Sequence, residues 1–214
     1  GLQTDKVILS PMSHAGYYPG GKVMTMKVVF EKETYRLLGA QIIGYEGVDK
    51  RIDVLATALH ANLKATQLKD LDLAYAPPFS SAKDPVNMAG YVVSNVIEGH
   101  MRPYAMEDLD KIPAEAIRLD VRTPEECAGG MMPGFINIPL DNLRERLGEL
   151  DLSKDIYITC QIGLRGYLAQ RILAQNGADT WNISGGYRFY DMMAKDKAAM
   201  AAVAGECTPC GMMK

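Results

Sequence analysis

Cys160 has the strongest chemical signature in this chain of 214 residues. It follows the apolar stretch Ile156–Thr159, which is typical of a strand, and a helical pattern begins near Arg165. A thiol between a strand end and a helix N-terminus faces unpaired backbone N–H groups and the positive end of the helix dipole. Both favour the thiolate, so we expect a reactive nucleophile rather than a buried structural cysteine.

The loop after Cys160 has the pattern C-x-x-G-x-R, in which Arg165 is the arginine. So short a loop suits one large, soft, negatively charged atom, such as the outer sulfur of a persulfide. Cysteine phosphatases use C-x5-R, a loop one residue longer, and that register would place Gly166 at the arginine position. Phosphate or arsenate chemistry is therefore disfavoured. The residues whose backbone N–H groups would cradle the sulfur are Gln161, Ile162, Gly163 and Leu164.

The segments around this loop alternate between strand and helix patterns. This alternation predicts a mostly parallel sheet with helices on both faces. Ligands of such sheets bind at the carboxyl ends of the strands, which is where Cys160 falls. The expected strands are 117–121, Ile156–Thr159 and Thr180–Ile183, and the expected helices are 140–147 and 165–174.

This region resembles the rhodanese family over residues 113–195. Besides the cysteine loop, the matching motifs are LDVRTPEE at 119–126, PGFINIPL at 133–140 and NISGGY at 182–187. The resemblance implies a sulfurtransferase that carries sulfur as a Cys160 persulfide, with Arg165 shaping the loop and adding positive potential. It also implies a sulfane-sulfur donor, a thiol acceptor, and a mainly structural role for Asp120 and Arg122.

Two positions depart from the rhodanese pattern. Met131 replaces the histidine of the family's G-H-I-P-G segment, and Gly166 replaces the small polar residue that usually follows the loop arginine. We expect the second departure to remove one hydrogen bond that supports the loop.

The first half of the chain has a different pattern. Segments 22–30 and 35–43 alternate as two strands of a hairpin, and Asp53 is expected to cap a helix. The pair Asp84-Pro85 is a good start for a second helix. Antiparallel strands with segregated helices indicate an α+β domain at 1–97, followed by a linker at 98–112 and then the α/β rhodanese-like domain.

Residues 1–97 resemble the dimerisation domain of the flavin-dependent pyridine nucleotide–disulfide oxidoreductases. The matching motifs are HAGYYPG at 14–20, LGAQIIG at 38–44 and YAPPFSSAKDP at 75–85. The closest branch is the coenzyme A disulfide reductases and their persulfide-reducing relatives, in which a fused rhodanese domain is a known arrangement. The resemblance implies a homodimer in which the Tyr17 and Tyr75 hydroxyls complete the partner subunit's active site. The structural alternative is that both are interface aromatics.

No G-x-G-x-x-G motif follows a strand, so a dinucleotide-binding half is not expected in these residues. The chain is interpreted as a C-terminal fragment of a longer flavoenzyme. That enzyme would use FAD, NAD(P)H and coenzyme A, whereas the fragment would bind no cofactor of its own.

Composition narrows the remaining possibilities. A net charge of −3 gives no case for nucleic acid or an anionic membrane, and no stretch is apolar enough to cross a bilayer. Four cysteines fit a reducing cytoplasm better than a disulfide scaffold, and the three scattered histidines make no metal site. The tail at 196–214 carries a C-x-x-C pair, Cys207 and Cys210. We interpret it as a disordered tail with two exposed thiols, and the alternatives are a sulfur-relay arm or the start of a further sulfur-carrier module.

A non-catalytic function remains open. In that alternative, residues 1–97 form a dimerisation platform and the rhodanese-like fold binds partners without turnover. The presence of Cys160 favours the enzyme, because inactive rhodanese-like modules generally lack the loop cysteine.

Overall fold

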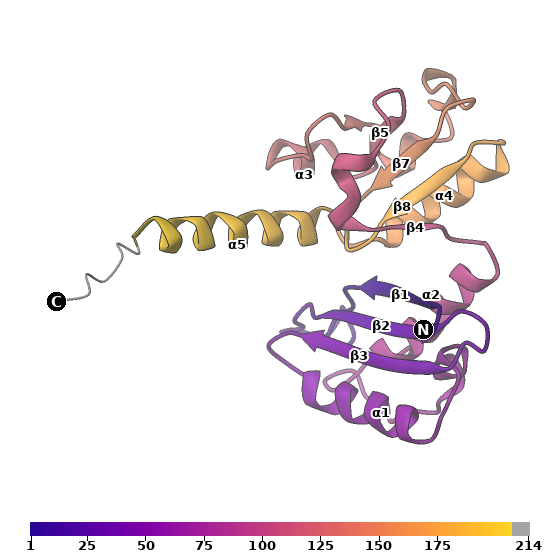
Figure 1. The fold of residues 1–214 in the computed structure, drawn as a ribbon, viewed down its shortest axis with the longest axis vertical. Coiled ribbons are helices and arrows are strands. Elements are labelled where there is room, and N and C mark those ends of the chain that lie inside the picture. Colours follow the sequence, from indigo (N-terminus) through magenta and orange to yellow (C-terminus); the bar gives the residue numbers. More distant parts are fainter. Residues whose placement is uncertain (207–214) are drawn as a thin grey trace.

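The computed structural model describes residues 1–206, so Cys207 and Cys210 lie outside the described residues. The chain forms two domains, each built around its own sheet (Figure 1). In the described part of the chain, no helix has both the length and the apolar character needed to cross a membrane.

The first domain contains a three-stranded antiparallel sheet in the order β1-β2-β3. Alternation along the central strand explains the layer, because Met26, Val28 and Phe30 are buried while the residues between them are half-exposed. The predicted hairpin is confirmed, and β1 adds a strand to its open edge. The elements are β1 (Thr4–Leu9), β2 (Thr25–Glu31), β3 (Leu37–Ile43), α1 (Val48–His60), η1 (Ala65–Asp70) and α2 (Pro85–Ile97).

Of the two helix starts predicted in this domain, one is confirmed and the other is wrong. Asp84 caps α2 as predicted, because its carboxylate accepts from the Val86 N–H at 3.0 Å. The prediction that Asp53 caps a helix is wrong. α1 begins at Val48, after Gly47 has turned the chain in a left-handed conformation with φ 66°, so Asp53 lies inside the helix.

The second domain contains a five-stranded sheet in the order β4-β8-β7-β5-β6. Every paired strand in it is parallel, which confirms the α/β prediction. Apolar clusters fill both faces of the sheet, as expected for parallel strands covered on two sides. Its elements are β4 (Pro103–Tyr104), η2 (Met106–Lys111), β5 (Ile117–Asp120), α3 (Pro124–Ala128), β6 (Ile136–Asn137), η3 (Leu140–Asn142), η4 (Leu147–Glu149), β7 (Ile156–Thr159), α4 (Leu164–Gln175), β8 (Thr180–Ile183) and α5 (Gly186–Glu206).

The helix predicted at 140–147 is wrong. The structure has two short 3-10 turns there, η3 and η4, and Leu143 between them is buried in the core. Asp141 and Asn142, in the first turn of the segment, are weak helix formers. A continuous helix is therefore only weakly favoured, and two short turns are enough to bury Leu143.

Two further segments differ from the simple expectation of a linker and a tail. The predicted linker at 98–112 contains β4, which pairs with β8, and η2, whose Met106 is buried. The first part of the predicted tail belongs to α5, which extends as a helix through Glu206. In Figure 1 this helix projects away from the second domain. Both segments therefore carry regular structure.

Candidate active site

Cys160 immediately follows β7, a strand whose four residues are all buried. Its side chain is 1% exposed and packs within the apolar cluster on one face of the sheet. The Sγ atom accepts a hydrogen bond of 3.1 Å from the backbone N–H of Gly163. The thiol thus lies beneath its own loop, with the Gly163 N–H directed at the sulfur.

The loop turns into α4 at Gly163. This residue has φ 110°, a conformation that favours glycine, and it is the N-cap of the twelve-residue helix. The positive end of the α4 dipole therefore lies beside Cys160, as the sequence predicted. Unlike the buried cysteine, Gln161, Ile162 and Gly163 are partly exposed, and Leu164 is 59% exposed.

The start of α5 fixes the loop from behind. The Tyr187 N–H donates to the Cys160 carbonyl at 2.7 Å, and the Arg188 N–H donates to the Gln161 carbonyl at 3.0 Å. A Cβ atom at Gly186, where φ is 63°, would lie 2.5 Å from the Cys160 carbonyl oxygen. The second glycine of the NISGGY motif is explained by this close approach of two backbones.

Arg165 does not point freely into the loop but pairs with Glu126 of α3. Its two terminal nitrogens each donate to one carboxylate oxygen at 2.7 Å. The hydrogen bonds from Arg165 lower the pKa of Glu126 to about 2. Glu126 also completes a capping box with Thr123 at the start of α3, which holds its carboxylate in place.

Sequence reasoning did not single out Glu126 as part of the site. Its only local signal is the capping-box spacing from Thr123 to Glu126, which indicates a helix start and says nothing of Arg165.

A buried ion pair lies at the end of the neighbouring strand β5. Asp120 accepts from the Arg122 backbone N–H at 3.0 Å and from its guanidinium at 2.7 Å. Arg122 also donates to the Gly130 carbonyl at 2.7 Å and stacks over the Tyr187 ring, 3.9 Å from its centre. This arrangement ties the turn after β5 to the start of α5, in agreement with a structural role.

Tyr17 and Tyr75, named as a pair from separate motifs, lie together in the first domain. Their hydroxyl oxygens are 2.5 Å apart, although 58 residues separate them in the sequence. Tyr17 is 76% exposed and Tyr75 47% exposed, so both hydroxyls lie at the surface. The hydrogen bond from Tyr17 raises the pKa of Tyr75 above its ordinary value.

Arg51 holds the two tyrosine-bearing segments in place and was not anticipated. Its guanidinium is buried and donates to the Ser13 carbonyl at 2.8 Å, the Phe79 carbonyl at 3.3 Å and the Asp84 carboxylate at 2.9 Å. The segments that carry Tyr17 and Tyr75 thus meet at one arginine. The sequence signal was an arginine on the otherwise apolar face of α1.

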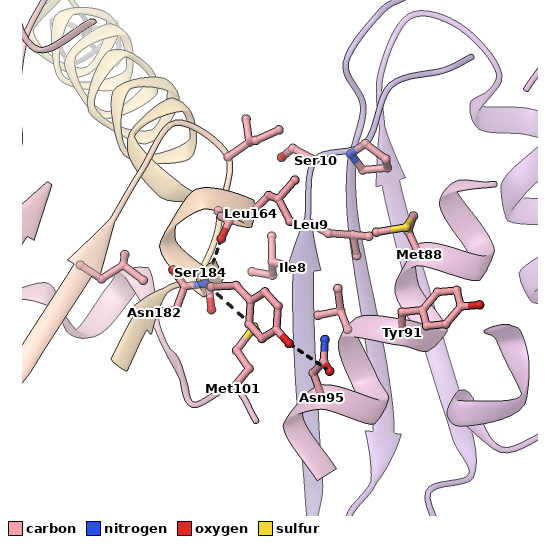
Figure 2. A pocket seen from close by; sticks show the side chains of 17 residues that line it. Ile8, Leu9, Ser10, Met88, Tyr91, Asn95, Met101, Leu164, Asn182 and Ser184 are labelled. Carbon is pink, nitrogen blue, oxygen red and sulfur yellow. Dashed lines mark hydrogen bonds between the residues drawn. The ribbon is translucent and has the colours of Figure 1, made fainter. Parts of the chain in front are cut away.

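Residues of both domains line a cavity of about 260 Å³. The first domain contributes the end of β1 and one face of α2, and the second contributes the loop after Cys160 and the end of β8 (Figure 2). Across it, the Tyr167 hydroxyl lies 3.5 Å from the Asn95 side-chain oxygen. The labelled residues of Figure 2 include Ile8, Leu9, Met88, Met101 and Leu164, so the lining is mostly apolar.

The histidines take separate positions. His14 is buried with its Nδ1 3.1 Å from the Ala15 carbonyl, whereas His60 and His100 are exposed. In residues 1–206, no three side chains of the metal-binding types are grouped.

The described residues also do not fit a dinucleotide. The first sheet is antiparallel, and the strand-to-helix turn that contains Cys160 presents a thiol rather than a glycine-rich phosphate loop.

Two families match this chain. Residues 1–85 match the pyridine nucleotide-disulphide oxidoreductase dimerisation domain, and residues 105–191 match the rhodanese-like domain. The chain therefore joins a pyridine nucleotide-disulphide oxidoreductase dimerisation domain to a rhodanese-like domain.

Individual proteins that are similar to this chain indicate a narrower class of protein. A coenzyme A disulfide reductase of Staphylococcus epidermidis is 44% identical over 87 residues, which are 41% of this chain and 20% of that protein. The solved structure of reduced Bacillus anthracis CoADR-RHD is 48% identical, with a TM-score of 0.85 over 88% of this chain and 34% of that chain.

An NAD-dependent persulfide reductase from A. fulgidus is 39% identical, with a TM-score of 0.81 and the same coverage. The chain thus resembles part of coenzyme A disulfide reductases and persulfide reductases. It spans about a fifth of the length of the curated relative and about a third of each solved chain.

Proposed function

We propose that this chain is a sulfurtransferase that carries sulfur as a persulfide on Cys160. The single observation that supports it most is the Gly163 N–H directed at the Cys160 sulfur, 3.1 Å away at the N-terminus of α4. A donor aimed at this atom stabilises a negatively charged sulfur, either the thiolate or the outer atom of a persulfide.

The proposed reaction has two displacements without net oxidation. The Cys160 thiolate attacks the sulfane sulfur of a donor such as thiosulfate, a new S–S bond forms, and sulfite leaves with the electron pair of the broken S–S bond. An acceptor thiolate then attacks the outer sulfur. The acceptor becomes a persulfide, and Cys160 leaves as a thiolate.

Access to the sulfur requires movement of the loop. Cys160 is 1% exposed, while Gln161, Ile162 and Gly163 above it are half-buried. Small donors are therefore expected to react faster than bulky ones.

The test is the intact mass of the protein after brief incubation with thiosulfate or polysulfide. Wild type is expected to gain about one sulfur atom, lost again on treatment with cyanide or a thiol. Cys160→Ser and Cys160→Ala are expected to gain none. A Cys160→Ala protein that keeps most of the transfer activity contradicts the assignment, because Cys127, the other cysteine among residues 1–206, lies inside α3 and not at a strand end.

The relatives suggest a reductase as the wider context. We infer that the chain works within an FAD- and NAD(P)H-dependent reductase of coenzyme A disulfide or of persulfides and polysulfides. In this proposal the first domain forms a homodimer, and the paired Tyr17 and Tyr75 hydroxyls donate a proton to a thiolate in the partner subunit. Their exposure and their contact of 2.5 Å support it.

The alternative is a dimerisation and partner-binding module without turnover. It would be favoured if no sulfane-sulfur donor loads Cys160 while the protein still forms a stable dimer. Light scattering of the purified chain, read together with the mass measurement, distinguishes the two.

A further inference from the structure

Asn182 links the sheet of the second domain to the loop of Cys160. It lies in β8 and is 4% exposed, and its Nδ2 donates to the Gly163 carbonyl at 3.1 Å. Gly163 in turn donates its N–H to the Cys160 sulfur, also at 3.1 Å. In Figure 2 one of the two dashed lines from Asn182 marks this contact, and the other runs toward Met101. One residue, Gly163, thus connects the amide with the sulfur.

The conformation of Gly163 explains why a hydrogen bond from Asn182 helps to fix the loop. Without a side chain and with φ 110°, its two flanking peptide groups are only weakly restrained. The Tyr167 N–H also donates to the Gly163 carbonyl at 2.9 Å, which is the first hydrogen bond of α4. Asn182 adds a donor from the sheet, so the carbonyl is fixed relative to β8 as well as to α4.

Gly166 leaves the space that Asn182 occupies. A Cβ atom at Gly166 would lie 2.3 Å from Asn182 Oδ1 and 3.1 Å from its Cγ. Among the described residues, Asn182 Oδ1 is the buried side-chain atom without a hydrogen-bond partner. An unpaired buried acceptor is unfavourable, so its retention needs a compensating role. The contact from Nδ2 to Gly163 supplies one.

We propose that Asn182 is a positioning residue for sulfur transfer at Cys160, and that Gly166 is its matched partner. Asn182 holds the Gly163 carbonyl so that the N–H on the other side of the same α-carbon stays directed at the sulfur. The hydrogen bond expected from a polar side chain at position 166 is supplied from β8 instead. This inference rests on the proposed persulfide chemistry.

The test compares four proteins: wild type, Asn182→Ala, Gly166→Ser and the double variant. The measurement is the rate of persulfide formation by intact mass, over a range of thiosulfate concentrations. Asn182→Ala is expected to lower the maximal rate about five- to tenfold, the effect of losing one hydrogen bond. Because Asn182 is not expected to touch the donor, the KM for thiosulfate should change little.

The double variant provides a rescue. Gly166→Ser alone is expected to be slow, because its Cβ collides with Asn182. With alanine at 182 the space is free, and a serine hydroxyl in a helix can donate to the carbonyl three residues earlier, which here is Gly163. The double variant should therefore be faster than either single variant.

Gln170→Ala is the matched control. Gln170 is another buried amide between the same two elements, and its Nε2 donates to the Thr180 carbonyl at 2.8 Å. Its loss should lower thermal stability about as much as Asn182→Ala but keep the rate within about twofold of wild type.

The outcomes separate the two proposals. Equal loading by wild type and Asn182→Ala, equal slowing by Gln170→Ala, or a double variant slower than both single variants would overturn the role of Asn182. If wild type itself forms no persulfide, the proposed function fails and this inference falls with it.

Discussion

Glu126 and Arg165 are 39 residues apart in the sequence but are joined by two hydrogen bonds of 2.7 Å. The pair connects the capping box of α3 to the first turn of α4. Arg165 is consequently held beside the Cys160 loop instead of moving in solvent. The loop thus has three fixed points: Glu126 through Arg165, the start of α5 through Tyr187, and β8 through Asn182.

Replacing Glu126 with Gln is expected to slow persulfide formation on the order of tenfold, because the amide lacks the negative charge and one of the two acceptor oxygens of the bidentate contact with Arg165. The measurement is the loading rate by intact mass. Glu125→Gln is the control, since Glu125 is adjacent and exposed but does not contact Arg165. Equal rates for the two variants would show that Arg165 needs no fixed partner.

The same pair predicts an acid-sensitive site. The pKa of Glu126 is lowered to about 2 from an ordinary value of 4.5 by the hydrogen bonds from Arg165. The stabilisation from this depressed pKa is fully present above pH 4.5 and is lost as pH falls toward 2. Acid unfolding of both proteins is followed by circular dichroism. It should begin at a higher pH in Glu126→Gln than in wild type, and the difference in their stability should shrink below pH 4.5.

Gly186→Ala should disrupt the site through the backbone. An alanine at φ 63° costs about 1–2 kcal/mol, and its Cβ would lie 2.5 Å from the Cys160 carbonyl oxygen. We expect a lower melting temperature and a loss of loading in the mass assay. Gly148→Ala, which has open space around its Cβ, should change neither. A Gly186→Ala protein with normal loading would mean that the start of α5 does not position the loop.

Removing one member of the buried Arg51–Asp84 pair should strongly destabilise the first domain. Arg51 is 1% exposed and donates to Asp84 at 2.9 Å, so Arg51→Met removes the guanidinium from a buried carboxylate and from three backbone carbonyls. The expected loss is about 3–5 kcal/mol in the free energy of unfolding. Urea denaturation measures it. The control is Lys50→Met at the preceding, partly exposed position, where a change within about 0.5 kcal/mol is expected.

The tyrosine pair predicts a spectroscopic signature. Because the hydrogen bond from Tyr17 raises the pKa of Tyr75, Tyr17→Phe should lower the pH at which Tyr75 ionises. Ultraviolet difference titration at the tyrosinate band follows this change, with Tyr75→Phe used to assign the signal. Tyr45→Phe, which alters an exposed tyrosine elsewhere in the domain, should leave the Tyr75 transition in place. An unchanged transition in Tyr17→Phe would rule out the pairing in solution.

The boundaries of several helices and strands can be predicted from the sequence alone. The apolar run Ile156–Thr159 ends at Cys160, and the helical spacing after it predicts α4 to within a residue at each end. Asp84 followed by proline predicts the start of α2. These features depend on a few neighbouring residues, whose backbone preferences and apolar spacing are present in the chain itself.

Which distant side chains meet depends on the tertiary structure. The contacts of Arg165 with Glu126 and of Asn182 with Gly163 depend on the order of the strands and on helix placement, which no local spacing encodes. The region 140–147 differs from its helical pattern for a related reason. Burial of Leu143 in the core constrains that segment, and Asp141 and Asn142 are weak helix formers, so tertiary packing outweighs a weak local preference.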